Sequence, residues 1–128
     1  MTKFLVHYHT AGRRHFDLRL VQGDRVRSWS MLKEPPLHTR DKRLAIEREE
    51  LPVETLHLPR IEEEAFGAGR VQVWDGGEVT EIATRPGMLI LTFGGKKMRG
   101  KYELRRMKWY PGNRWLLEKS ASSGPNLT

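Results

Sequence analysis

The stretch His9-Thr-Ala-Gly-Arg-Arg-His15-Phe-Asp17-Leu-Arg19-Leu decides how the rest of the chain is interpreted. From His15 to residue 21, polar and apolar residues alternate, which is the period-two pattern of a half-buried β-strand. Because successive strand side chains point to opposite faces of a sheet, His15, Asp17 and Arg19 share one face. His9 precedes a glycine turn, so the chain can fold back and bring His9 beside that face.

Two imidazoles and one carboxylate on adjacent positions make a mixed nitrogen and oxygen ligand set that suits a divalent transition metal. Zinc, manganese and iron(II) all remain open at this point. The alternative is that His9 and His15 are histidines of the surface or the core edge and that Asp17 pairs with an arginine. His-x-Asp also occurs by chance in many sequences. A metal site is therefore one of two interpretations of this stretch.

The length and composition of the chain limit what the protein can be. With 128 residues it is long enough for one domain with its own core, which we expect over residues 1–119. Residues 120–128 have the composition of a flexible tail. The absence of cysteine excludes disulfides, thiolate zinc sites and cysteine nucleophiles. Any metal must therefore be bound by histidine, aspartate or glutamate.

The charge of the chain points to an anionic partner. Lys and Arg together number 23 and Asp and Glu 16, which gives a net charge of +7 and favours nucleic acid ahead of a membrane. A basic protein without such a partner is the alternative. The longest apolar runs are far shorter than the roughly 20 residues that span a bilayer, and the N-terminus lacks the apolar region of a signal peptide. We expect a cytoplasmic protein that does not bind a membrane.

Short strands separated by turns are predicted along most of the chain. They cover residues 4–9, 15–21, 25–32, 70–74, 78–82, 88–93, 101–107 and 114–119. Residues 43–49 suit either a helix or a strand, and as a strand they place Arg43, Glu47 and Glu49 on one face. Residues 61–66 have the composition of a single helical turn. So many short strands at this spacing predict a mainly β protein that is a closed barrel or a sandwich.

Further blocks follow the opening stretch in a fixed order. They are Ser28-Trp-Ser-Met-Leu-Lys33, Lys42-Arg-Leu-Ala45, Phe66-Gly-Ala-Gly69, Val73-Trp-Asp75, Gly95-Lys-Lys-Met-Arg-Gly100 and Trp115-Leu-Leu-Glu-Lys119. With the His-x5-His-x-Asp-x-Arg run, they resemble the 3′-phosphoesterase domain of bacterial DNA ligase D and its stand-alone archaeal and bacterial relatives. The resemblance covers nearly the whole chain. It implies a compact antiparallel β-barrel with one or two short helical turns.

The resemblance also implies an activity. Enzymes of this family are manganese-dependent and trim the 3′ ends of DNA during repair. They remove a terminal ribonucleoside from the primer strand of a primer-template and then remove the 3′-phosphate, leaving a 3′-hydroxyl for a ligase or a polymerase. The implied partners are therefore DNA 3′ ends, together with a DNA ligase and a polymerase of the same pathway.

Site residues follow from the resemblance by position. The implied ligands of Mn²⁺, or of another divalent transition metal, are His9, His15 and Asp17. The implied phosphate-binding arginines and further active-site carboxylate are Arg19, Arg43 and Glu49. The charge pattern adds candidates for contact with the DNA backbone, although scattered lysines more often only keep a protein soluble. These candidates are Lys33, Lys96, Lys97 and Lys101.

One departure from the family concerns the phosphate-removing step. The family usually has a histidine two residues after the position of Glu49, and this chain has Leu51 there. A tyrosine that usually follows corresponds to Thr55. Because the family's histidine supports removal of the 3′-phosphate, we expect that step to be impaired here. His38 or His57 would have to replace it from a neighbouring loop.

Two other function classes compete with this interpretation. An iron(II) oxygenase of the cupin type would use His15, Asp17 and the distant His57 as a facial triad in a small barrel. That alternative leaves His9 unused and does not explain the arginines or the net charge. The second alternative is a nucleic-acid-binding module whose catalytic site has decayed, which the substitution at Leu51 would fit.

Overall fold

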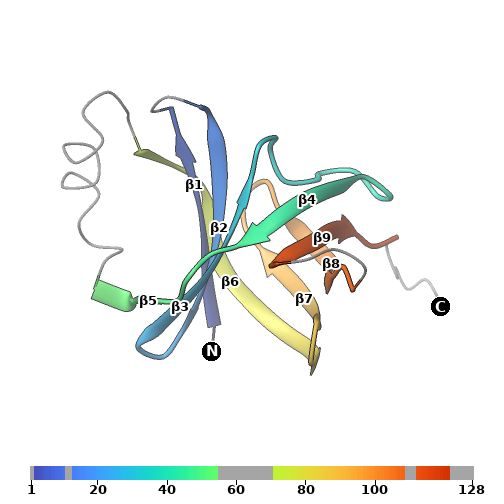
Figure 1. Cartoon of the computed structure of the whole chain (residues 1–128). Coiled ribbons are helices and arrows are strands. Elements are labelled where there is room, and N and C mark those ends of the chain that lie inside the picture. The colour runs from blue at the N-terminus through green and yellow to red at the C-terminus, as the bar shows by residue number, and fades with distance from the viewer. Residues whose placement is uncertain (1, 11–12, 55–70, 109–111, 122–128) are drawn as a thin grey trace.

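The computed structural model describes residues 2–10, 13–54, 71–108 and 112–121. The strands of this part are β1 (Thr2–His9), β2 (His15–Gln22), β3 (Arg25–Met31), β4 (Lys42–Glu47), β5 (Leu51–Pro52), β6 (Val71–Arg85), β7 (Met88–Gly94), β8 (Arg99–Arg106) and β9 (Arg114–Lys119). They pair in the order β2-β1-β6-β7-β8-β9-β4-β3-β5, and an additional β2–β3 pairing closes the ring (Figure 1). The mainly β antiparallel barrel that we expected is therefore confirmed, with β5 added along the edge of β3.

The hairpin of β1 and β2 sets which residues face the core and which face outward. His9 lies opposite His15, and His7 lies opposite Asp17. Side chains alternate along each strand, so the neighbours of these polar residues point the other way. Those neighbours are the core residues Phe4, Val6, Leu18 and Leu20. The polar residues of β1 and β2 therefore lie on the outer face of the barrel wall.

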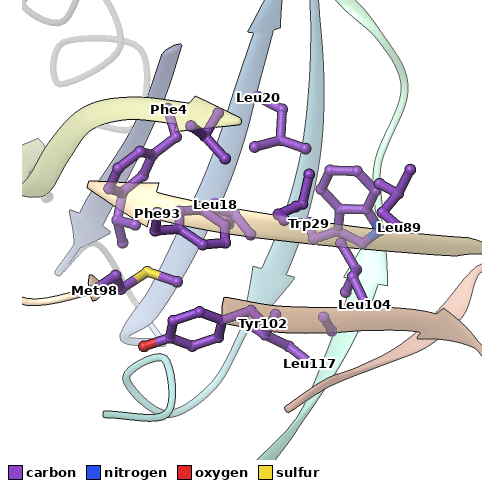
Figure 2. Packing of buried hydrophobic residues seen from close by; sticks show 14 of the residues in the cluster. Phe4, Leu18, Leu20, Trp29, Leu89, Phe93, Met98, Tyr102, Leu104 and Leu117 are labelled. Atoms are coloured by element: carbon purple, nitrogen blue, oxygen red, sulfur yellow. The ribbon is translucent and has the colours of Figure 1, made fainter. Parts of the chain in front are cut away.

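The interior is filled by large apolar side chains from opposite walls of the barrel (Figure 2). Phe93 lies between Phe4 and Tyr102, with ring centroids at 4.8 and 5.0 Å and edge-to-face geometry. Tyr102 is buried, but its hydroxyl donates a 2.6 Å hydrogen bond to the carbonyl oxygen of Pro36. Full burial of an apolar side chain such as Phe4 or Phe93 contributes roughly 1.5–3 kcal/mol to the free energy of folding. This core therefore packs against the inner side of the wall that carries the polar residues.

The fold differs from expectation at Gly76 and Gly77. We expected a turn there between two strands, but β6 runs through both glycines as one strand of 15 residues. A Cβ atom at Gly77 would lie 2.5 Å from the carbonyl oxygen of Gly94 on β7. The glycine pair therefore permits close approach between neighbouring strands rather than a reversal of the chain.

The ambiguous segment of residues 43–49 is a strand only as far as Glu47. Arg43 and Glu47 lie opposite the core residues Leu117 and Trp29, so both point to the interior side of the wall. Glu49 lies beyond the end of the strand. The prediction that Arg43, Glu47 and Glu49 share one face of a strand is therefore wrong for Glu49. The chain bends there from β4 toward β5, which breaks the alternation that the prediction assumed.

Helical structure in the described residues is confined to a turn that begins at residue 53. The turn expected at residues 61–66 lies outside the described residues. No helix in the described ranges is long and apolar enough to cross a membrane. Most of the expected tail also lies outside them, although the amide of Ser120 still donates a 2.9 Å hydrogen bond to the carbonyl oxygen of Lys101.

Asp75 anchors the loop between β7 and β8 to β6. Its carboxylate accepts hydrogen bonds from the amides of Gly76, Lys96, Lys97 and Met98 at 2.7–3.0 Å. Burial raises the pKa of Asp75, but these four amides outweigh burial and hold the pKa below its usual value. A single charged side chain therefore fixes the conformation of the loop.

We expect Asp75→Ala to lower the free energy of unfolding by about 3 kcal/mol, because buried amides lose a charged acceptor. Asp75→Asn, which keeps one carbonyl oxygen, should lose less. The pKa of Asp75 is lower in the folded protein than in the unfolded chain. The stabilisation by its carboxylate is therefore complete above the pKa of the unfolded chain and is lost as the pH falls through the pKa of the folded protein. The difference in the free energy of unfolding between the parent protein and Asp75→Asn, measured by urea titration, should therefore become smaller below about pH 4. Asp24→Asn, at an exposed turn, is the control and should change little; an equal loss there would contradict the assignment.

Candidate active site

Three potential metal ligands converge on the outer face of β1 and β2. The ligand atoms of His9, His15 and Asp17 all lie within 4.8 Å of one another. Asp17 Oδ2 is 2.8 Å from His9 Nε2 and 3.4 Å from His15 Nε2. The two imidazole rings stack with centroids 4.5 Å apart and an interplanar angle of 6°. The cross-strand pairing of His9 with His15 produces this convergence directly.

The histidines present the atoms that a metal requires. His15 Nδ1 lies 3.1 Å from the carbonyl oxygen of Arg13 and donates to it, so the lone pair of its Nε2 points toward Asp17. His9 Nε2 is buried, and its 2.8 Å contact with Asp17 does not have hydrogen-bond geometry. A buried nitrogen without a partner among the described residues is costly unless a further group binds there. The donor set therefore fits a divalent transition metal.

Asp17 is held as a charged carboxylate. Ser30 on β3 donates a 2.5 Å hydrogen bond to Oδ1, which leaves Oδ2 directed at the histidines. Burial raises the pKa of Asp17, but the contacts with His9 and Ser30 and the charge of Arg19 outweigh burial and lower the pKa to about 2. The carboxylate is therefore ionised at neutral pH.

Arg19 lies beside the cluster in a fixed orientation. Its Nε donates to His7 Nδ1 at 3.0 Å, and its Nη1 donates to Ser28 Oγ at 3.0 Å. Its Nη2 lies 3.5 Å from Asp17 Oδ2. Burial, followed by the nearby charge of Arg19, lowers the pKa of His7 to about 4, so His7 is a neutral acceptor. These contacts use three of the five N–H groups of Arg19, and the other two remain for a ligand.

A hollow of about 980 Å³ lies over the cluster and has two kinds of wall. His9, His15, Asp17 and Arg19 line its charged floor, together with Arg13, Ser28, Ser30, Arg48 and Glu49. The apolar wall is formed by Met31, Leu32, Ile46 and Leu51. Leu32 exposes 60% of its surface, so its side chain is accessible to a ligand in the hollow. The hollow therefore offers both an anion-binding floor and an apolar surface.

Arg43 is not brought to this hollow. Its Nε and Nη1 donate to the carbonyl oxygens of Glu34 and Lys42 at 2.6 and 2.9 Å. Arg48 lines the hollow instead, and its Nε donates a 3.1 Å hydrogen bond to Ser30 Oγ. Arg48 is thereby linked through Ser30 to Asp17.

None of the four candidate lysines is among the residues that line the hollow. Lys97 Nζ lies 4.5 Å above the ring of Trp74, which contacts Phe16 on the core side of β2. Lys101 belongs to β8, which lies across the barrel from β2. Lys33 and Lys96 are exposed. Their expected contact with DNA remains a prediction.

The comparison with known families agrees with this geometry. The DNA ligase D 3′-phosphoesterase domain matches residues 7–106, which include the whole His9, His15 and Asp17 cluster. The chain belongs to this family. The predicted resemblance is thereby confirmed.

Relatives of this 3′-phosphoesterase domain occur inside much longer proteins. The chain is 33% identical over 132 residues to the multifunctional non-homologous end joining protein LigD of Mycolicibacterium smegmatis, with 91% of the chain and 16% of that protein covered. It is 32% identical over 112 residues to the protein of the same name from Pseudomonas aeruginosa, with 83% and 13% covered. The chain thus spans less than a fifth of the length of these relatives.

The structure adds residues to the candidate site that the sequence patterns discussed above did not identify. Ser28 and Ser30 could have been found, because alternation around the buried Trp29 places both on one face of β3. His7 could have been found in the same way from its position two residues before His9. Arg48 lies beyond the end of β4, where no periodic pattern indicates its direction.

Proposed function

We propose that this chain is a metal-dependent phosphoesterase that processes the 3′ ends of DNA and releases a 3′-terminal ribonucleoside. The observation that carries the proposal is the convergence of His9, His15 and Asp17 beside a fixed Arg19, in a chain of the DNA ligase D 3′-phosphoesterase family. The oxygenase alternative leaves His9 unused, although His9 lies 2.8 Å from Asp17. Its third ligand, His57, lies outside the described residues.

His9, His15 and Asp17 would hold the metal, and we propose Mn²⁺ because the donor set suits it and the family resemblance implies it. When bound, such a metal supplies a Lewis acid that polarises a phosphoryl oxygen. Ser30 keeps Asp17 Oδ2 directed at the histidines, and the carbonyl oxygen of Arg13 fixes the tautomer of His15. These supporting contacts prepare the ligands before the substrate arrives.

Arg19 would bind and stabilise the reacting phosphodiester. Its two remaining N–H groups stay in a fixed plane, because His7 and Ser28 hold the other side of the guanidinium. A preorganised guanidinium stabilises the negative charge that builds on the phosphoryl oxygens in the transition state. We propose Arg48 as the second arginine of this site and Glu49 as the group that orients an arginine or accepts a proton.

The apolar wall suits the departing nucleoside. A terminal nucleoside combines a charged phosphate with a base and a sugar that present apolar surface. Leu32, Ile46 and Leu51 line the same hollow as the charged groups, so both the phosphate and the apolar parts of a nucleotide find matching lining residues. The two walls therefore favour a nucleotide end over an inorganic anion.

We further propose that the biological substrate is a primer-template with a 3′-ribonucleotide and that a DNA ligase and a polymerase act on the product. The relatives are named multifunctional non-homologous end joining proteins, which supports a role in repair of DNA ends. The net charge of +7 supports binding of nucleic acid.

A 5′-labelled DNA primer that ends in one ribonucleotide tests the proposal. With Mn²⁺ we expect the ribonucleoside to be released, which shortens the primer by one nucleoside, and a chelator should abolish the reaction. Zinc and magnesium in separate reactions identify which metals the site accepts. A reaction that proceeds at the same rate in a chelator would rule out the metal-dependent mechanism.

Matched arginine variants refine the same assay. Arg48→Gln should lower kcat more than Arg43→Gln, because Arg48 lines the hollow whereas Arg43 donates to backbone carbonyl oxygens. Loss of one such donor typically lowers the rate on the order of 10²-fold. The reverse order would return the phosphate-binding role to Arg43.

A further inference from the structure

A second hollow of about 370 Å³ lies beside the turn between β6 and β7, and it has no role in the function proposed above. Three arginines line it: Arg27 from β3, Arg85 at the end of β6 and Arg106 at the end of β8. Glu47 is the single acidic residue among the described residues of its lining. We refer to it as the arginine hollow.

Glu47 is already paired within this hollow. Arg27 donates from Nε and Nη2 to Glu47 Oε2 at 3.2 and 2.9 Å. The guanidinium of Arg27 also lies over the rings of Trp29 and Trp115, at 4.8 and 5.7 Å from their centroids. The ion pair and the stacking hold Arg27 in place. Because Glu47 is paired with Arg27, the described lining contains no further acidic group that could neutralise the other arginines.

The other two arginines keep an excess of positive charge in the arginine hollow. No ion pair joins Arg85 or Arg106 to an acidic residue in the described part of the chain. Arg106 has one long contact, 3.4 Å from Nη2 to the carbonyl oxygen of Gly112. Two guanidinium groups around a concave surface favour an anion with several oxygens.

The arginine hollow adjoins the candidate active site. Glu47 and Asn113 line both hollows, and the amide of Glu47 donates a 2.8 Å hydrogen bond to the carbonyl oxygen of Asn113. We refer to this pair of residues, which borders both hollows, as the ridge. An extended ligand that ends at the metal cluster can therefore cross the ridge and reach the arginines.

We propose that the arginine hollow binds a backbone phosphodiester of the DNA whose 3′ end occupies the active site. The proposal rests on the function proposed above and adds a second anchoring site. The excess charge, the fork geometry of guanidinium groups and the shared ridge favour a polynucleotide over an acidic peptide, because successive phosphates recur along one strand. Arg85 and Arg106 bind the phosphate, and Arg27 with Glu47 shapes the floor.

The test compares two double variants with equal loss of charge. Arg85→Gln with Arg106→Gln removes the proposed contacts, and Lys3→Gln with Arg99→Gln removes two exposed cations outside the hollow. Fluorescence anisotropy measures affinity for a labelled primer-template with a single-stranded end of about 12 nucleotides. We expect the first double variant to weaken binding about tenfold and to reduce the salt slope by roughly 1–2, and the control to change affinity about twofold at most.

A small substrate separates this proposal from the proposed function. Bis(4-nitrophenyl) phosphate has one phosphate and cannot occupy both hollows. Its hydrolysis should be unchanged in Arg85→Gln with Arg106→Gln, while kcat/KM on the primer falls about tenfold through KM. Cleavage of neither substrate by the parent protein would overturn the proposed function, and a selective loss of DNA affinity would still support the arginine hollow.

Two results would overturn the arginine hollow itself. One is an equal effect of both double variants on DNA binding. The other is unchanged DNA affinity with loss of polyglutamate binding, which would assign the hollow to an acidic peptide. If the double variant unfolds, Arg85→Gln alone provides the test, because Arg85 lies at an exposed turn. This single variant should raise the logarithm of the DNA dissociation constant by about a third to half of the increase expected for the double variant.

Discussion

Asp17→Asn is expected to lower the rate of 3′-end processing by about 10³-fold or more while the barrel remains folded. Asp17 Oδ2 lies within 3.5 Å of His9 Nε2, His15 Nε2 and Arg19 Nη2, so one atom joins the metal ligands to the phosphate-binding arginine. An amide nitrogen at this position repels Arg19 and does not bind a cation. The variant should therefore lose both metal binding and turnover.

Three measurements on Asp17→Asn separate loss of chemistry from loss of structure. Equilibrium dialysis gives the stoichiometry of bound Mn²⁺, the labelled primer gives kcat, and thermal unfolding reports the fold. Asp24→Asn carries the same change of charge at an exposed turn and should retain all three properties. Ser30→Ala, which removes only the hydroxyl that orients Asp17, should lose about 10–100-fold in metal affinity. Full activity in Asp17→Asn would exclude the cluster as the catalytic site.

The sequence predicted the cluster because it depends on local geometry. Alternation along a strand put Asp17 and Arg19 on the face of His15, and the short loop after His9 set the register of the hairpin. Both properties belong to neighbouring residues and need no knowledge of the remaining chain. For the same reason, the alternation around the buried Trp29 is sufficient to place Ser28 and Ser30 on one face of β3.

Features that depend on contacts between strands distant in the sequence could not be predicted from the alternation of neighbouring residues. Gly76 and Gly77 have the sequence pattern of a turn, but the close approach of Gly94 on β7 explains the continuous strand. The ammonium group of Lys97 lies over the ring of Trp74, a contact that no local sequence pattern indicates. The direction of Arg48 depends on where β4 ends, because pairing with β3 and β9 sets the end of that strand. Each of these features requires the tertiary structure.

The product of the labelled primer reaction is expected to accumulate as a 3′-phosphate end. Leu51 occupies the position where the family usually has a histidine, and it lies on the apolar wall of the hollow, where it cannot exchange a proton. His38 is exposed and is not among the residues that line the hollow, and His57 lies outside the described residues. Metal ligands and Arg19 are present, so release of the ribonucleoside should proceed without the phosphate-removing step.

Leu51→His should then restore removal of the 3′-phosphate. A general acid or base contributes on the order of 10²–10⁴ in rate, and the new imidazole would line the same hollow as the metal cluster. Leu32→His is the matched control, since it places an imidazole on the same apolar wall at a different position and should give no comparable gain. Gel electrophoresis separates the 3′-phosphate and 3′-hydroxyl products by charge. If the unmodified protein forms the 3′-hydroxyl rapidly, and still does so with His38→Ala and His57→Ala combined, the histidine position is dispensable, and the metal cluster and arginines must suffice for both steps.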